Sequence, residues 1–128
     1  MTNRTKLWND ERGATAVETA FVLPVILVFI YGIFMMGVMF HAKAGLQNGL
    51  GEGARYATIY PVPTDAQIRA KISAKVFRLG IGTFGAPTVT SGSGYKDLAV
   101  SFTMTPNFIF YTPPPITLNQ SKRVYIAG

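Results

Sequence analysis

Between Glu18 and His41 the chain runs for 22 residues without a charge. Thirteen of these residues are Leu, Ile, Phe or Val. As an α-helix the stretch would be about 33 Å long, which is enough to cross a bilayer core of about 30 Å. The core of so small a soluble domain would not need so uniform an apolar stretch, so we predict a single membrane-spanning helix.

The rest of the chain is short. Of 128 residues, about 70 remain outside the helix, which is room for one small domain. A core of that size is marginal alone, so we expect the domain to pack against an extension of the helix. The chain has no Cys, which excludes disulfides and thiolate metal sites. We divide it into a cytoplasmic leader, 1–13, a transmembrane and extended helix, 14–60, and a small α+β domain, 61–128.

The charges that flank the apolar stretch predict its orientation. Arg4, Lys6 and Arg12 precede it, whereas Lys43 is the only Lys or Arg in the first ten residues after it. Positively charged flanks tend to remain in the cytoplasm. We therefore expect a cytoplasmic N-terminus and a translocated C-terminal part.

Three kinds of processing are compatible with the N-terminal residues. Ala42-Lys43-Ala44 fits the small-x-small pattern of a secretory cleavage site, but the apolar stretch of 22 residues exceeds the about 7 to 15 of such signals. The helix could instead remain as an uncleaved anchor. Cleavage after Gly13 would leave Ala14 as the new N-terminus, and small side chains there offer a protease an accessible, extended backbone.

A series of short motifs resembles a known family. RGATAVE at 12–18 is followed by FVLP at 21–24, LQN at 46–48 and EGARYA at 52–57. In this order they resemble the TadE-like proteins, which are pilin-like or pseudopilin components of the bacterial tight-adherence (Tad or Flp) pilus. The resemblance covers residues 12–59. Short Flp pilins commonly have Tyr after the Glu that corresponds to Glu18, whereas this chain has Thr19, so it is similar to a TadE-like subunit and not to a major Flp pilin.

The resemblance implies a cleavage site and a role. A prepilin peptidase would cut between Gly13 and Ala14, so that Glu18 becomes the fifth residue of the mature chain. The product would be a structural subunit that enters or initiates a Tad pilus for surface attachment, as a homo- or hetero-oligomer. Its partners would be other pilin subunits and the Tad inner-membrane platform. It would be a single-pass protein of the bacterial inner membrane, and later of the periplasm or an extracellular pilus.

The position of Glu18 also has a physical rationale. On a helix, the new amino group of Ala14 and the carboxylate of Glu18 would lie on one face. Pairing offsets part of the about 2.5–3.5 kcal/mol that a charge costs deep in hydrocarbon. Between two subunits, the same pair would set the axial offset of neighbouring helices, which is the assembly role that the resemblance implies. Alternatively, Glu18 is a surface charge satisfied by water and lipid headgroups.

Two further features of the long helix concern packing. Pro24 removes a backbone hydrogen bond and can bend the helix, either as a tolerated kink or to form a curved packing surface. Beyond the membrane, Gly45, Gly49 and Gly53 recur every four residues. Because each Gly costs a helix about 0.8–1 kcal/mol relative to Ala, this spacing predicts a face on which the domain or a neighbouring subunit packs closely. Beside them runs an apolar stripe of Leu46, Leu50, Ala54 and Ala57.

Residues 61–80 predict the end of this helix and a second one. Pro61-Val62-Pro63 should end the first helix, and Thr64 with Gln67 should cap a second that stops before Gly80. Its predicted buried side consists of Ile68, Ile72, Val76 and Leu79. We interpret its basic residues as a solvated face rather than a surface for lipid, polysaccharide or DNA, so we expect no nucleic-acid partner. These residues are Arg69, Lys71, Lys75 and Arg78.

From Thr83 the pattern changes to the period of two that is typical of strands. We predict strands at 88–90, 98–105 and 116–126. The aromatic patch Phe108–Tyr111 is either part of the core, which we favour, or an exposed binding surface. An antiparallel sheet of about three strands with two helices gives an α+β fold, a lollipop of the type IV pilin kind.

The sequence offers no set of residues for catalysis. It has no phosphate-binding loop, no paired carboxylates and no Ser/His/Asp arrangement. His41, the one histidine, has no nearby Cys or carboxylate that would make it a metal ligand or a base. We therefore expect neither a cofactor nor a metal, and a protein that is not an enzyme.

Overall fold

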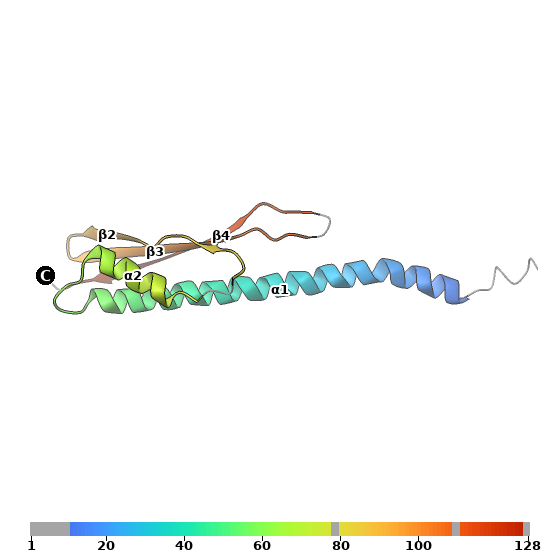
Figure 1. Ribbon diagram of the computed structural model, residues 1–128, viewed down its shortest axis with the longest axis horizontal. Coiled ribbons are helices and arrows are strands. Elements are labelled where there is room, and N and C mark those ends of the chain that lie inside the picture. Colours follow the sequence, from blue (N-terminus) through green and yellow to red (C-terminus); the bar gives the residue numbers. More distant parts are fainter. Residues whose placement is uncertain (1–10, 78–79, 109–110, 127–128) are drawn as a thin grey trace, which may run out of the picture. The chain divides into compact units, whose positions relative to one another are not determined.

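A computed structural model of the chain describes residues 11–77, 80–108 and 111–126. It separates into two units, Met1–Phe34 and Met35–Gly128, the second of which we call the C-terminal unit. The predicted α+β class, with a long N-terminal helix that leads into a small domain, is confirmed. The elements are α1 (Glu11–Ala57), α2 (Asp65–Lys75), β1 (Thr83–Phe84), β2 (Thr88–Gly92), β3 (Tyr95–Met104) and β4 (Ile116–Tyr125) (Figure 1).

In the first unit α1 is apolar on every side. From Gly13 to Ile30 every residue is exposed, including Phe21 with 75% of its surface. A helix that is apolar all round requires apolar surroundings, so this part of α1 needs lipid or other helices. From Gly13 to Ala57 the helix is long and apolar enough to span a membrane, as the uncharged stretch predicts. We call Gly13–Phe34 the apolar segment.

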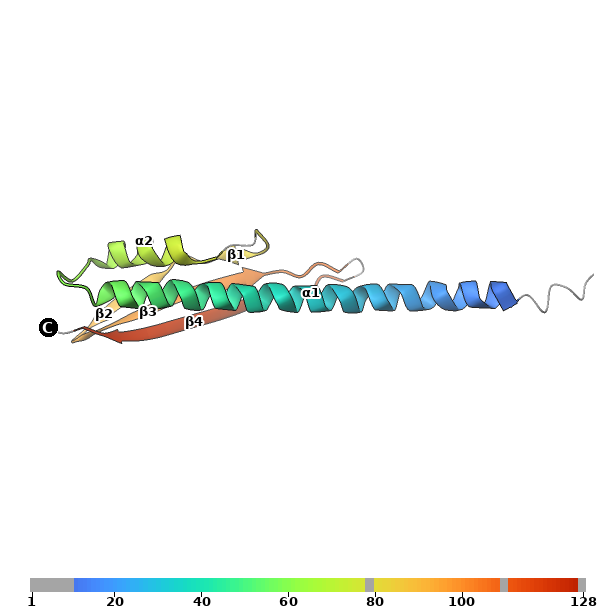
Figure 2. The same ribbon diagram turned by 90° about the horizontal axis from the view of Figure 1, so that it is seen from below.

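From Met35 onward α1 buries one side only. The predicted stripe of Leu46, Leu50, Ala54 and Ala57 is buried, and Val38 and Ala42 extend it toward the N-terminus. Both α2 and the sheet lie along this part of α1 (Figure 2). They add apolar side chains to the core, namely Ile68, Ile72, Val76, Leu98, Val100, Phe102 and Met104.

The end of α1 lies at Ala57, shortly before Pro61-Val62-Pro63. There the Thr58 hydroxyl donates a hydrogen bond of 2.8 Å to the Arg55 carbonyl. The amide of Thr58 reaches the same carbonyl at 3.4 Å, which closes the last turn. The prediction that the helix ends near these prolines is therefore confirmed to within about a turn.

α2 begins where the sequence predicts and ends earlier. The Thr64 hydroxyl accepts a hydrogen bond of 3.3 Å from the Gln67 amide, and the Gln67 side chain accepts one of 2.9 Å from the Thr64 amide. The prediction that the helix continues nearly to Gly80 is wrong, because Val76 already has an extended backbone, with φ −73° and ψ 126°. That change of direction lets Val76 stay buried while the Phe77 backbone packs against α1. Leu79 lies outside the described residues.

Gly45, Gly49 and Gly53 of α1 lie against α2 and the residues that follow it. A Cβ atom added to Gly45 would come within 3.0 Å of the Phe77 carbonyl oxygen, and one added to Gly49 within 3.2 Å of the Ile72 carbonyl oxygen. One added to Gly53 would lie 2.3 Å from Cγ1 of Ile72. Of the two partners that the spacing left open, the structure places the chain's own second helix on this face.

β3 is the central strand of a four-stranded antiparallel sheet. β4 pairs with its whole length, from Tyr95↔Tyr125 to Met104↔Ile116, so β1 and β2 share its other edge. The predicted alternation of β3 is confirmed, since Leu98, Val100, Phe102 and Met104 are all buried. The three predicted strands are present. The additional strand, β1, has two residues, too few to show a period of two.

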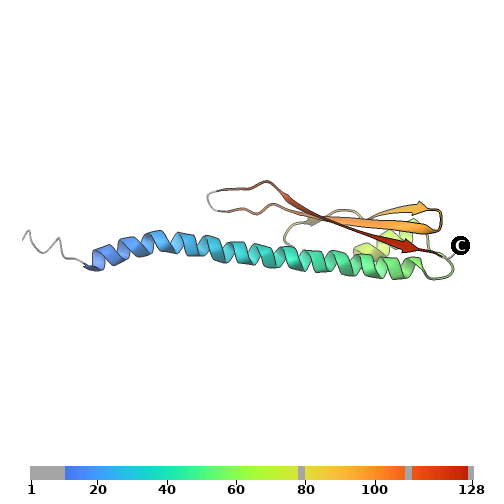
Figure 3. The same ribbon diagram turned by 180° about the vertical axis from the view of Figure 1, so that it is seen from behind.

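The connection between β3 and β4 leaves the sheet at the end opposite the C-terminus (Figure 3). Its backbone hydrogen bonds between Phe108 and Tyr111 measure 3.0 and 3.2 Å. Phe108 is half-buried, but Tyr111 is 64% exposed, so the predicted core position is wrong for Tyr111. The reason is that the connection lies beyond Met104, the last core residue of β3. Ile109 and Phe110 lie outside the described residues.

Substituting the buried glycines tests this packing. Gly53→Ala should lower the free energy of unfolding of the C-terminal unit by about 1–2 kcal/mol, because overpacking against Ile72 outweighs the gain in helix propensity. Gly51→Ala is the matched control, since a Cβ there meets no atom within 4 Å, and should raise that free energy by about 0.5–1 kcal/mol. Urea unfolding of the full chain in detergent, followed by near-ultraviolet circular dichroism, measures both. Equal stabilisation by the two substitutions would contradict the close contact.

Candidate cleavage and assembly site

Gly13 and Ala14 lie near the start of α1, which begins at Glu11. Both residues are exposed. Their backbone is helical, so the extended conformation that we expected for a protease site is not the one in the structure. A peptidase that needs an extended backbone would therefore have to unwind the helix at the Gly13–Ala14 bond.

Glu18 lies one turn after Ala14 on α1, and its side chain is exposed. Residues four apart share a helix face, so the structure puts Glu18 on the same face as Ala14. Among the ion pairs of the described residues none involves Glu18. Its neighbour Thr19 donates its hydroxyl to the Thr15 carbonyl at 2.8 Å. That bond satisfies a polar group in an otherwise apolar region.

Pro24 lies inside α1, within the apolar segment. Since proline has no backbone N–H, the Ala20 carbonyl lacks the amide that would normally bond to it. The residues on both sides of Pro24 are exposed. Gly45, Gly49 and Gly53 differ from it, because α2 and the residues that follow it already cover them.

A buried lysine joins α2 to the sheet, which the sequence did not predict. Lys96 of β3 is 7% exposed, and its Nζ forms an ion pair with Oδ1 of Asp65, the first residue of α2. The Ser91 hydroxyl donates to both carboxylate oxygens, at 3.1 and 3.2 Å. The hydrogen bond from Lys96 lowers the pKa of Asp65, and the bond from Ser91 contributes in the same direction.

A second ion pair lies on the other face of the sheet. Arg123 of β4 donates to Asp97 of β3 through Nε at 2.7 Å and through Nη2 at 2.9 Å. Its guanidinium carbon is 4.4 Å from the centre of the Tyr95 ring. The hydrogen bond from Arg123 lowers the pKa of Asp97, and the same bond raises the pKa of Arg123. These contacts fix the β3–β4 register and contain no group that is free to act as an acid or base.

The remaining candidate residues show no metal or catalytic arrangement. His41 is exposed, and its ring lies 6.1 Å from that of Phe77. The described residues contain no group of three His, Cys, Asp or Glu side chains that could hold a metal ion. On the basic side of α2, Arg69 and Lys75 are exposed, and Lys71 Nζ is 5.6 Å from the centre of the Tyr56 ring. Arg78 lies outside the described residues.

The comparison with protein families concerns α1. Residues 13–55 match the family model described as TadE-like protein. The resemblance seen in the sequence is thereby confirmed for this TadE-like segment, which runs from the expected cleavage site nearly to the end of α1. The segment contains Glu18, Pro24 and the three glycines that contact α2 and the residues after it. No match was found among curated proteins or solved structures.

The TadE-like match and the length of the apolar helix together indicate a membrane-anchored protein associated with a Tad pilus. The TadE-like segment includes both an exposed apolar region and the part of α1 that supports the C-terminal unit. Chemically, the site around Glu18 can supply one negative charge on an apolar helix surface.

Low pH should lower the free energy of unfolding of the C-terminal unit. Folding lowers the pKa of Asp65. The ion pair therefore stabilises the folded unit at pH values above the ordinary carboxyl pKa of about 3.9. This stabilisation is lost as the pH falls through the lowered pKa that Asp65 has in the folded state. Asp65→Asn should reduce the free energy of unfolding at pH 7 by about 1–2 kcal/mol, since Lys96 stays buried without its anion. The difference between the variant and the original chain should shrink as the pH is lowered from 7 to 2. Urea unfolding across this range measures the effect, and an equal loss at both pH values would refute it.

Proposed function

We propose that this protein is a structural, non-enzymatic subunit of a Tad pilus or of the complex that initiates one. It is made as a single-pass precursor in the bacterial inner membrane, with the N-terminus in the cytoplasm. A prepilin peptidase cleaves it between Gly13 and Ala14, and it then joins other pilin subunits through the Tad inner-membrane platform. The observation that carries the proposal is the TadE-like match over an α1 whose first unit is apolar all round.

The exposed apolar segment suits two environments, which the protein occupies one after the other. Before assembly, lipid surrounds side chains such as Phe21 and Phe29, which are largely exposed in the single chain. After assembly, the same side chains pack against the helices of other subunits. A helix that is apolar on every side suits both environments, because it can be covered from any direction.

Glu18 supplies the specificity that an apolar surface lacks. It is the only Asp, Glu, Lys or Arg between Gly13 and Phe40. Once helices surround it, a lone carboxylate is costly unless it is paired. The amino group that cleavage creates on Ala14 of a neighbouring subunit is a suitable partner. A pair of this kind favours one axial offset between helices, because any other offset leaves both charges without a partner.

The alternatives differ in how the N-terminus is processed. An uncleaved anchor that presents a protein-binding domain is the second candidate, and the helical backbone at Gly13 and Ala14 favours it. Release by cleavage at Ala44 is disfavoured. Ala42 and Val38 are 3% and 4% exposed within the core of the C-terminal unit, and cleavage would remove both from it.

Replacing the carboxylate tests the proposed assembly role. Glu18→Ala should insert in the membrane and be cleaved as before, because the change makes the segment more apolar and leaves Gly13 and Ala14 intact. It should nevertheless fail to assemble, since the inter-subunit pair is lost. The measurement is the amount of subunit in the sheared pilus fraction of cells that carry the variant, compared with the amount in their membranes.

Glu52→Ala is the matched control for this experiment, because it removes a carboxylate from α1 outside the apolar segment. It should assemble normally. Normal assembly of Glu18→Ala would remove Glu18 from the proposed mechanism.

A further inference from the structure

The end of α1 and the start of α2 border an open cavity of about 270 Å³, which we call the α1–α2 pocket. Much of its apolar lining is exposed, since Ile59 has 48% of its surface exposed and Val62 has 46%. A contiguous exposed apolar surface on a small domain commonly marks a site where another molecule binds. The residues that line the pocket are Tyr56, Ile59, Pro61, Val62, Pro63 and Gln67.

The pocket has hydrogen-bond donors beside its apolar wall. The side-chain oxygen of Gln67 accepts the bond from the Thr64 amide, which leaves the Nε2 amide of Gln67 to donate. The Tyr56 hydroxyl is a second donor. Lys71 Nζ lies 5.6 Å from the centre of the Tyr56 ring, an attraction that holds this ring from the α2 side. Such a pocket suits an apolar segment that offers hydrogen-bond acceptors.

Pro113-Pro114-Pro115 is a segment of this kind. Proline has no backbone N–H, so the segment offers carbonyl acceptors and no backbone donor. Its fixed φ angles favour a polyproline II helix, and its last two residues are exposed. The Thr112 hydroxyl before it donates to Oδ1 of Asn107 at 3.2 Å, and β4 begins directly after it. A preformed proline segment loses little conformational entropy on binding, and aromatic-lined grooves recognise such segments.

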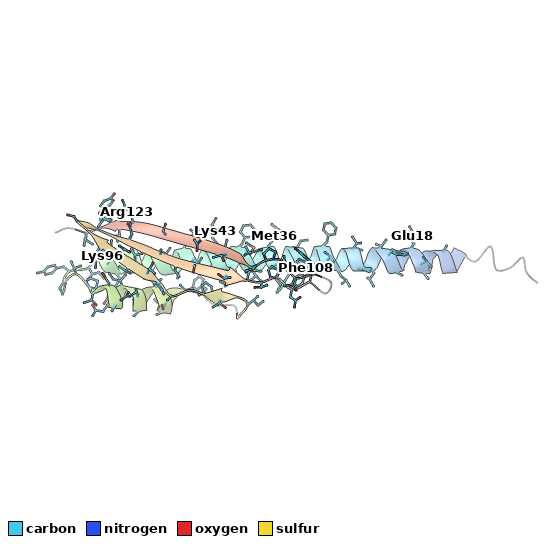
Figure 4. The ribbon with its side chains drawn as sticks, turned by 90° about the horizontal axis from the view of Figure 1, so that it is seen from above. Glu18, Met36, Lys43, Lys96, Phe108 and Arg123 are labelled. Carbon is cyan, nitrogen blue, oxygen red and sulfur yellow. The ribbon has the colours of Figure 1, made fainter. Side chains whose placement is uncertain are left out.

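The pocket and the proline segment lie at opposite ends of the C-terminal unit. The pocket lies next to Asp65, the first residue of α2, which forms an ion pair with Lys96 near the start of β3. Ile116, directly after the prolines, instead pairs with Met104 at the end of β3. Figure 4 shows Lys96 at one end of the unit and Phe108, in the β3–β4 connection, at the other. The two ends of β3 are about 26 Å apart, so one chain cannot place its proline segment in its own pocket.

We propose that the α1–α2 pocket binds the Pro113–Pro115 segment of a second copy of this chain. The prolines pack on the apolar wall, and their carbonyls accept hydrogen bonds from Tyr56 and Gln67. The inference rests on the oligomeric assembly in the proposed function and adds a contact that does not use Glu18. Because the two surfaces differ and lie at opposite ends of the unit, the contact joins copies head to tail and allows a chain of subunits to grow.

Engineered disulfides test this contact, because the chain has no Cys of its own. The full-length double variant Val62→Cys/Pro114→Cys is produced in native cells from which the original gene is deleted, and the sheared pilus fraction is mildly oxidised. A disulfide requires the two Cβ atoms to lie about 4 Å apart. If the pocket of one copy holds the segment of the next, the double variant should give a ladder of covalent multimers on a non-reducing gel.

Val62→Cys/Ser121→Cys is the matched control, because Ser121 is exposed on the same hairpin outside the proline segment. It should give no ladder. An equal ladder from this control, or dimers of a Val62→Cys single variant, would overturn the inference, because the pocket would then face another surface. A Val62→Cys/Pro114→Cys chain that enters the pilus fraction without forming the ladder would overturn it too and leave the proposed function intact. Absence of the original chain from that fraction would contradict the proposed function itself.

A second variant decides the matter if the cysteines prevent assembly. Val62→Arg places a charge on the apolar wall and should reduce the ratio of subunit in the pilus fraction to subunit in the membranes by about tenfold or more. Ser121→Arg should leave this ratio unchanged, since Ser121 lies outside both proposed surfaces. An unchanged ratio for Val62→Arg would overturn the inference.

Discussion

The close contact between α1 and α2 is the interaction on which the C-terminal unit depends. At Gly45, Gly49 and Gly53 the second helix and the residues after it come so near that a methyl group would touch backbone or β-branched side chains. Such an approach requires glycine, and each glycine lowers the stability of the helix relative to alanine. Burial of Ile68, Ile72 and Val76 against α1 offsets this loss of stability. With α2 held there, Asp65 reaches Lys96, and the sheet is fixed to the helix pair.

One helix therefore has two kinds of surface. From Gly13 to Ile30 its side chains are exposed on every side and, apart from Glu18, uncharged and mostly apolar, which suits lipid or other helices better than water. After Met35 a single stripe is buried by the chain's own domain, and the other side carries residues such as Lys43 and Arg55. The TadE-like segment spans this change. In the proposed function, the subunit moves from lipid into a bundle of helices without refolding its domain, because the two surfaces are separate.

Much of this was predictable because it follows from local patterns. The apolar stretch, the glycines at every fourth position, the Thr64–Gln67 capping box and the alternation of β3 each arise within a few residues. The early end of α2 at Lys75 was not predictable, since it depends on how Val76 and Phe77 meet α1. The ion pair between Asp65 and Lys96 joins residues that are 31 apart, and no sequence pattern indicates it. The exposure of Tyr111 depends on where the core ends, which the alternation of β3 does not reveal.

For the candidate site, the sequence suggested Gly13, Ala14 and Glu18, and the structure gives their exposure and backbone conformation. Gly13 and Ala14 are accessible but helical, so the proposed cleavage needs the helix to unwind at this bond. The central claim is that this helix belongs to a processed pilin-type subunit, and the N-terminal residue of the mature protein from native cells tests it most directly. The account predicts Ala14. Met1 would mean a permanent anchor and Gly45 a secreted protein, and either result would contradict the account.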